Sequence, residues 1–259
     1  MFDTAVASAM LPSWLLAVIL GVAGAIAGSF LSTIVVRWPA DRSVLHGRSA
    51  CDGCGRTLAA WELIPIVSAI AARGRCRSCG ARINPRHTAV EIGCAAIGIV
   101  SALATPGLAG IAGAVFGWLL LTLAVLDADE FWLPDPLVAA LALTGLASAN
   151  WCQPPLVDRL IGGAGGFALL WLVAAGYRLA RGREGLGGGD PKLFGAIGLW
   201  LGWRMLPAVL LLAGLIGLGV VLLQIIRGRT VDAQDALPFG TFLGLAAYPA
   251  WLVMVILGP

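Results

Sequence analysis

The side chains of this 259-residue chain that could do chemistry include acidic residues placed at the ends of apolar segments. Asp127 ends the apolar run 115–126, and Asp190 follows the glycines 185 and 187–189. Ionisable groups at such places are costly to keep, which makes them candidates for function. Two neighbouring carboxylates share one proton, so one can activate water while the other protonates a leaving amine, as in aspartic proteases. We therefore expect Asp127 and Asp190 to form such a pair.

Three of the acidic residues also have a structural interpretation. Asp135-Pro136 and Asp190-Pro191 have the pattern of a helix N-cap followed by proline, and Thr88-x-x-Glu91 has that of a capping box. A cap can still react, and the helix N-terminus favours ionised Asp190 as the base. Asp127 has no capping pattern.

Two basic residues are ambiguous in the same way. Lys192, the only lysine, could set the charge of the pair or bind substrate, and Arg86 could also support a site. Both could equally be positively charged anchors on the cytoplasmic side of a membrane.

The second chemical group is four cysteines, spaced as Cys51-x2-Cys54 and Cys76-x2-Cys79. Two such knuckles can close four thiolates around one zinc ion. All four positions are cysteine and none is left open, which favours structural over catalytic zinc. A redox pair or free thiols are the alternatives.

The composition predicts the kind of secondary structure that must hold these groups in place. The chain is 59% hydrophobic and 12% charged, with mean hydropathy +0.91, which excludes an ordinary soluble domain. We predict an all-α polytopic membrane protein, since a span needs about 20 apolar residues. The eight candidate segments are 14–36, 88–105, 107–127, 136–150, 157–179, 191–203, 207–226 and 239–257, with a break at Arg204 and Pro207 between the sixth and seventh.

Charge predicts the domains and the orientation. Residues 37–86 carry nine arginines and three acidic residues, a net of +6, whereas the remainder has a net of −3. We expect a first transmembrane helix (1–36), a cytoplasmic cysteine domain (37–87) and a core of about seven helices (88–259). An N-terminus outside places most cations inside, together with the cysteines, Asp127 and Asp190. The basic segment has only two aromatic residues, Trp38 and Trp61, so we expect contact with anionic lipid rather than nucleic acid.

These residues carry a resemblance to a known family. The chain resembles the type IV prepilin peptidases, which are bifunctional leader peptidases and N-methyltransferases, over nearly its whole length. The matching elements are Gly28-Ser29-Phe30-Leu31, Arg37-x-Pro39, the two cysteine knuckles, Arg86, Glu91, Asp127 with Leu133-Pro134-Asp135, Gly185-Leu186-Gly187-Gly188-Gly189-Asp190-x-Lys192, and Pro238-Phe239-Gly240. Ser32, His87-Thr88 and Pro191 depart from the family's usual residues.

The resemblance implies a function. The family's catalytic aspartates fall on Asp127 and Asp190, and its zinc ligands on Cys51, Cys54, Cys76 and Cys79. The family cleaves prepilins or secretion pseudopilins after a glycine, at the cytoplasmic edge of the bacterial inner membrane. It then methylates the new N-terminus with S-adenosylmethionine. No residue of the methylation site is predicted, and the oligomeric state stays open.

Two other classes of protein remain as alternatives. A secondary transporter also places acidic residues near broken, glycine-rich helices, although its ion-binding acids should lie near the membrane midplane. A zinc-anchored scaffold of a pilus or secretion machine would need the cysteines but not the paired aspartates.

Overall fold

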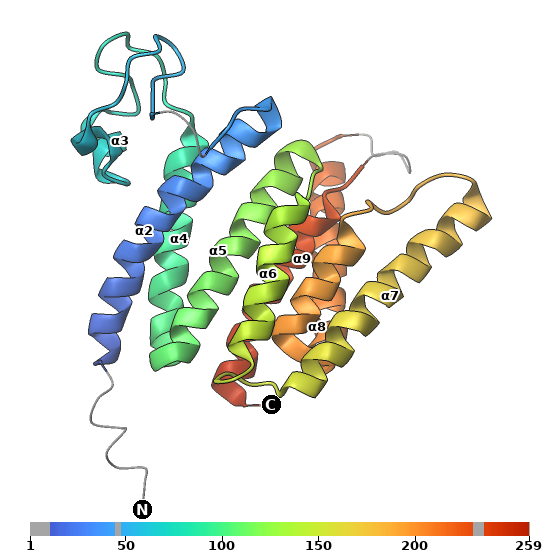
Figure 1. The fold of residues 1–259 in the computed structure, drawn as a ribbon. Coiled ribbons are helices and arrows are strands. Elements are labelled where there is room, and N and C mark those ends of the chain that lie inside the picture. The colour runs from blue at the N-terminus through green and yellow to red at the C-terminus, as the bar shows by residue number, and fades with distance from the viewer. Residues whose placement is uncertain (1–10, 45–47, 230–235, 259) are drawn as a thin grey trace, which may run out of the picture. The chain divides into compact units, whose positions relative to one another are not determined.

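The chain is helical in the computed structural model, which describes residues 11–44, 48–229 and 236–258 (Figure 1). Within these ranges there is no strand, only two isolated bridges, Ala50–Thr57 and Arg75–Arg82. The predicted all-α class is confirmed. The long helices are α2 (Ser13–Arg37), α4 (Pro85–Ala104), α5 (Gly107–Glu130), α6 (Asp135–Ser148), α7 (Leu156–Arg181), α8 (Asp190–Ile226) and α9 (Phe239–Leu257), and the short ones are η1 (Trp38–Ala40), η2 (Ala60–Leu63) and α3 (Val67–Ala71).

Six of these helices, α2, α4, α5, α7, α8 and α9, are long and apolar enough to cross a membrane. The chain is therefore a multi-pass membrane protein. Helix α6 has 14 residues and so rises about 21 Å, less than the roughly 30 Å of a hydrocarbon core. It corresponds to the fourth predicted segment, which was expected to be slightly longer.

The sixth and seventh predicted segments are joined in α8, a 37-residue element interrupted at Gly202. Gly202 has φ 69° and ψ 173°, a conformation outside the helical region that glycine adopts without a steric penalty. The break therefore comes before the predicted position at Arg204 and Pro207. The first stretch of α8 packs against α7, and the second against α9. With α6 and the divided α8, each of the eight predicted segments corresponds to a helical stretch.

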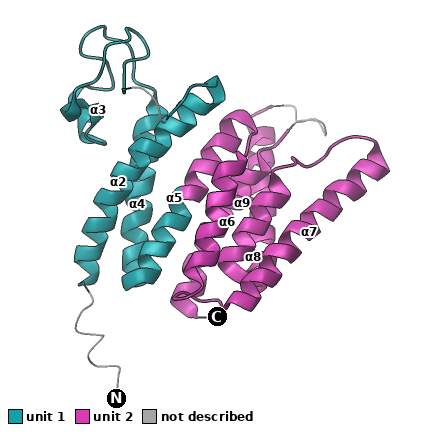
Figure 2. Cartoon of the chain, in the orientation of Figure 1, with its two compact units in different colours: residues 1–118 teal, residues 119–259 magenta. Residues whose placement is uncertain are grey.

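The contacts of the chain divide it into two compact units, residues 1–118 and 119–259 (Figure 2). The boundary falls within α5. The division into a first helix, a cysteine domain and a peptidase core remains a prediction.

The first unit is built on the close packing of α2 against α4. A Cβ atom on Gly24 would lie 2.3 Å from the carbonyl oxygen of Cys94, and one on Gly28 would lie 2.8 Å from the Cα atom of Glu91. The small-residue face of the first helix therefore lets the two backbones meet, as small-xxx-small faces do. Figure 1 shows the segment that carries α3 at the end of this pair where α2 ends and α4 begins.

The second unit is held by a similar contact between α7 and α8. A Cβ atom on Gly198 would lie 2.3 Å from the carbonyl oxygen of Gly162. Beside this contact the guanidinium of Arg159 is fully buried. Its hydrogen-bond acceptors are the carbonyl oxygens of Gly145, Cys152, Gln153, Pro154 and Leu199 and the hydroxyl of Ser148, at 2.7–3.2 Å. This cation joins α6 and the α6–α7 connection to α8.

Candidate active site and metal centre

Asp127 lies in the last turn of α5 and is only 5% exposed. Its Oδ2 atom accepts a hydrogen bond from the backbone N–H of Thr241 at 2.6 Å and lies 3.0 Å from the Thr241 hydroxyl. The same hydroxyl is 2.9 Å from the carbonyl oxygen of Ala124. The first turn of α9 therefore holds this carboxylate from a position 114 residues away in the sequence.

Asp190 is the first residue of α8 and is also 5% exposed. Its Oδ2 atom accepts the backbone N–H of Gly187 at 3.0 Å, so the carboxylate is turned back onto the glycine loop. Gly189 occupies the N-cap position, and no side chain caps the helix. The predicted capping role of Asp190 is therefore wrong.

Leu133 brings the segments around these two carboxylates together. A Cβ atom on Gly189 would lie 2.8 Å from the Leu133 Cβ atom. A Cβ atom on Gly240 would lie 2.9 Å from the Leu133 Cδ1 atom and 3.0 Å from Asp127 Oδ2. The second unit thus places the two predicted aspartates on segments that both pack against Leu133, in a setting where Gly189 and Gly240 leave no room for a side chain.

Two charged residues near the aspartates, Asp135 and Lys192, form an exposed ion pair with each other. The carboxylate of Asp135 accepts a hydrogen bond from the Lys192 ammonium group at 2.7 Å, and both side chains are well exposed. Helix α6 has Pro134 at its N-cap position with no side-chain cap, so the predicted capping role of Asp135 is wrong. The ion pair connects the beginnings of α6 and α8.

Glu91 and Arg86 belong to the first unit. Helix α4 begins at Pro85, and its first turn is capped by Asn84, whose side chain accepts the N–H of Arg86 at 3.0 Å. The capping box predicted for Glu91 is therefore wrong. Glu91 is 7% exposed, and its carboxylate accepts the backbone N–H of Ile66 at 2.7 Å. It fixes the cysteine segment to α4.

The four predicted cysteines do come together, and their Sγ atoms all lie within 4.8 Å of one another. Cys51 Sγ and Cys79 Sγ are 3.8 Å apart. Four sulfurs at about 2.3 Å from a tetrahedral zinc ion would lie about 3.8 Å from one another. The cluster therefore fits a metal ion of this kind.

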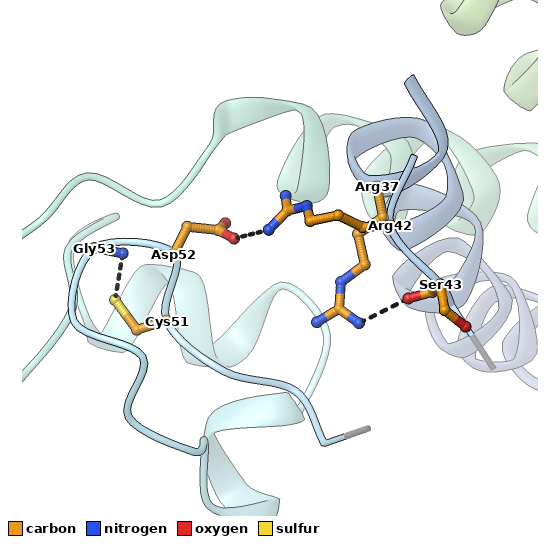
Figure 3. Close-up of polar contacts among 6 residues, drawn as sticks. All are labelled: Arg37, Arg42, Ser43, Cys51, Asp52 and Gly53. Carbon is orange, nitrogen blue, oxygen red and sulfur yellow. Dashed lines mark hydrogen bonds and ion pairs between the residues drawn. The ribbon is translucent and has the colours of Figure 1, made fainter. Parts of the chain in front are cut away.

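The two knuckles have the same backbone. Cys51 N–H donates to the Arg56 carbonyl oxygen at 2.9 Å, and Cys76 N–H donates to the Ala81 carbonyl oxygen at 2.8 Å. Figure 3 shows the first knuckle, where Gly53 N–H donates to Cys51 Sγ at 3.4 Å. Its Asp52 is paired with Arg42 at 2.9 Å.

Electrostatics favour the metal-binding form of one cysteine of the cluster, Cys76, and an ion pair lies in the same segment. The backbone N–H groups of Cys79 and Ser78 lower the pKa of the Cys76 thiol to about 6, which favours the thiolate that a metal requires. The hydrogen bond from Arg56, 2.6 Å long, and another from the N–H of Ala59 hold the pKa of Glu62 below its usual range. Neither η2 nor α3 contains a buried residue. A segment with so little core would gain folding energy from the metal.

Comparison with known proteins identifies the family. The family described as "Bacterial Peptidase A24 N-terminal domain" matches residues 22–105, and the "Type IV leader peptidase family" matches residues 114–222. A prepilin leader peptidase/N-methyltransferase of Burkholderia pseudomallei (strain 1026b) is 41% identical over 208 residues, which are 79% of this chain and 67% of that protein. The chain belongs to the type IV leader peptidase family.

More distant members cover more of the chain. The prepilin leader peptidase/N-methyltransferase of Pseudomonas putida is 35% identical over 89% of this chain and 88% of its own length. That of Pseudomonas aeruginosa is 35% identical over 88% of this chain and 87% of its own. No solved structure gave a significant match.

The leader peptidase match includes both aspartates of the pair, and the N-terminal domain match includes the four cysteines. Thr241 lies outside both matched ranges and was not among the predicted site residues. A signal was present in the adjacent Pro238-Phe239-Gly240 element. Its glycine is what allows α9 to begin directly beside Asp127.

Proposed function

We propose that this chain is an intramembrane aspartic peptidase that removes the basic leader of type IV prepilins or secretion pseudopilins and N-methylates the new N-terminus. The observation that carries the proposal is the pair of buried carboxylates, Asp127 and Asp190, at one end of a bundle of apolar helices. The names of its relatives support both the peptidase and the methyltransferase activity.

The chemistry follows from one proton shared by two carboxylates. One carboxylate takes a proton from water as the water oxygen attacks the scissile carbonyl carbon. The other carboxyl group gives its proton to the amide nitrogen as the C–N bond breaks. A prepilin has a short basic leader followed by an apolar helix, so its scissile bond lies at the membrane edge. Both aspartates occupy helix ends, where such a bond could reach them.

The cofactors have separate roles. Zinc would be held by Cys51, Cys54, Cys76 and Cys79 and would stabilise the fold of the cysteine segment. S-adenosylmethionine would supply the methyl group, and we assign it no residues.

The proposed location is the bacterial inner membrane, with the cysteine cluster and the two aspartates on the cytoplasmic side. The net charge of +6 over residues 37–86 supports this orientation. The outside N-terminus of the proposal falls on residues 1–10, which are outside the described part of the chain.

The two alternative classes make different demands on the site. A transporter would place its acidic residues near the midplane, whereas Asp127 lies in the last turn of α5 and Asp190 in the first turn of α8. A scaffold would have no need for two buried carboxylates on segments that both pack against Leu133.

Mass spectrometry of a synthetic prepilin incubated with the purified chain and S-adenosylmethionine tests the proposal. We expect a single cut after the glycine that ends the leader, and one additional methyl group on the new N-terminus. An uncleaved substrate would contradict the peptidase and favour the scaffold or the transporter. Cleavage without methylation would leave the peptidase standing and remove the second activity.

A further inference from the structure

The hydrogen bonds around the two aspartates are unequal, and this inequality has a chemical consequence. Asp127 Oδ2 receives the N–H of Thr241 at 2.6 Å and lies 3.0 Å from its hydroxyl. Asp190 Oδ2 receives one N–H, that of Gly187, at 3.0 Å. Hydrogen bonds donated to a carboxylate stabilise its ionised form.

The N–H that reaches Asp127 comes from the beginning of a helix. Thr241 is the third residue of α9, whose N-cap residue, Pro238, offers no capping side chain. The first N–H groups of a helix have no partner within it, and the positive end of the helix dipole favours an anion. Asp127 therefore caps α9 from a different helix. Asp190 bonds to its own preceding loop instead.

The Thr241 hydroxyl has one proton and two acceptors, the Ala124 carbonyl oxygen at 2.9 Å and Asp127 Oδ2 at 3.0 Å. An ionised Asp127 receives that proton together with the N–H of Thr241. A protonated Asp127 could instead donate to the hydroxyl oxygen, but Oδ2 would then be a weaker acceptor for the short 2.6 Å bond. The arrangement favours the ionised form.

We infer that Thr241 is a positioning residue that keeps Asp127 as the resting carboxylate, so that Asp127 is the base and Asp190 the acid. This is the reverse of the assignment expected from the position of Asp190 at a helix N-terminus. It rests on the proposed peptidase function. In the hydrolysis step, Asp127 accepts the proton of the attacking water. Asp190 transfers its own proton to the departing amine, and the pair ends with the proton on Asp127.

The charges that face Asp127 are few. Asp190 approaches from α8, and nearby Lys192 is already paired with Asp135. On α5 itself, Asp129 and Glu130 are exposed. Helix α9 contains no charged residue. Helix α9 therefore acts on Asp127 through hydrogen bonds, and Thr241 donates the two that the structure shows.

The test is the pH profile of kcat/KM for leader cleavage by wild type, Thr241→Val and Thr241→Ser. Valine retains the shape and the N–H of Thr241 but not the hydroxyl. We expect it to move the acidic limb upward by about one pH unit, while serine keeps the wild-type profile. Thr144→Val is the matched control, because that hydroxyl donates within α6 to the Ala140 carbonyl oxygen. Thermal unfolding in detergent verifies that each variant is folded.

The possible outcomes separate the inference from the function on which it rests. A shift of the alkaline limb in place of the acidic limb in Thr241→Val would show that Asp127 is the acid, and would overturn the assignment. Unshifted limbs in a folded variant would show that Thr241 positions nothing. If the wild-type protein cleaves no prepilin, the proposed function itself is wrong.

A second feature, in the first unit, is an exposed apolar patch. Its members, all 42–69% exposed, are Trp61, Leu63, Ile64, Val67 and Ile70. Soluble proteins seldom leave so many large apolar side chains together on the surface. Arg73 and Arg75, both exposed, follow directly after α3.

This patch lies beside the membrane-spanning helices of its unit. The N–H of Ile66 reaches the carboxylate of Glu91, the seventh residue of α4, which is about 9 Å along the axis from the first residue. A short helix with exposed apolar residues, followed by exposed arginines, has the composition of an interfacial anchor. We propose that residues 61–70 insert into the lipid interface of the membrane that the chain spans.

A phospholipid with a photoreactive group in its acyl chain tests this placement in the full chain, reconstituted with anionic lipid. Peptide mapping should locate the label in residues 61–70, whereas the knuckle segments 51–55 and 76–80 serve as the unlabelled control. An unlabelled patch would overturn the proposal. Labelling of the patch by a photoreactive prepilin instead of by lipid would also overturn it.

Discussion

Four of the charged side chains in the described part of the chain are buried, and each has partners that offset the cost of removing it from water. They are Glu91, Asp127, Arg159 and Asp190. Glu91 and Arg159 bind backbone groups of other parts of their units, which makes them structural. The two aspartates also accept backbone N–H groups, but burying two carboxylates near each other adds a cost that Glu91 and Arg159 do not have. This difference distinguishes the residues of the candidate active site from buried charged residues that only stabilise the fold.

Arg159 gives a stability prediction at this scale. Arg159→Met removes every donor from a group of buried carbonyl oxygens, and unsatisfied buried groups are costly, so we expect a loss of about 2–4 kcal/mol. Thermal unfolding in detergent measures it. Arg204→Met is the control, because that side chain is 66% exposed and its nearest acidic oxygen, on Asp158, is 3.6 Å away. Equal unfolding temperatures for the two variants would contradict the structural role of Arg159.

The segments around the aspartates pack so closely that some glycines leave no room for a Cβ atom. This packing predicts which glycine substitutions reduce cleavage. In Gly189→Ala the new Cβ atom would lie 2.8 Å from Leu133. We expect a loss of cleavage of at least 10-fold, because small displacements of reacting groups lower rates strongly. Gly188→Ala, with no atom within 4 Å of the new methyl group, should be close to wild type. Rates of prepilin cleavage compare the two. A pair of equally active variants would argue against this packing.

The cysteine segment has a pH dependence of its own. Because Arg56 lowers the pKa of Glu62 in the folded state, the ion pair contributes stability above the carboxyl group's ordinary pKa. That contribution is lost as pH falls through the lowered value. Glu62→Gln should therefore unfold at a lower temperature than wild type at pH 7, and the difference should disappear in acid. A difference that persists unchanged in acid would show that the charge of Glu62 is not involved.

The helices and their contacts also show how much of the fold and of the candidate site could be predicted from the sequence. The apolar segments, the cysteine cluster and the aspartate pair were predictable, because each depends on residue types that are costly or rare in such a chain. The helix caps at Asp135, Asp190 and Glu91 were predicted wrongly. Asp135 and Glu91 bind partners from distant segments, Lys192 and Ile66, and Asp190 turns back onto its own glycine loop. Thr241 could not be found, because its role depends on α9 beginning beside α5.

At the scale of the whole molecule, the topology that we propose has the cysteine cluster and the two aspartates on the cytoplasmic side of the membrane. A cysteine introduced at Glu130, at the end of α5, should react with a membrane-impermeant thiol reagent only in inside-out vesicles. One introduced at Asn150, between α6 and α7, should react only in right-side-out vesicles. Labelling of both positions from the same side would contradict the topology. The background is a chain in which Cys152 is replaced by alanine.

In the mechanism that we propose, Asp127 and Asp190 perform the hydrolysis, and the cysteine cluster has a separate, structural role. The most direct test of this claim is the rate of prepilin cleavage by wild type, Asp127→Asn and Asp190→Asn, with bound metal measured in each sample. We predict a loss of roughly 1,000-fold or more in both variants, a full metal content, and near wild-type activity in the control Asp129→Asn. Cleavage that persists in either variant of the pair would contradict the claim.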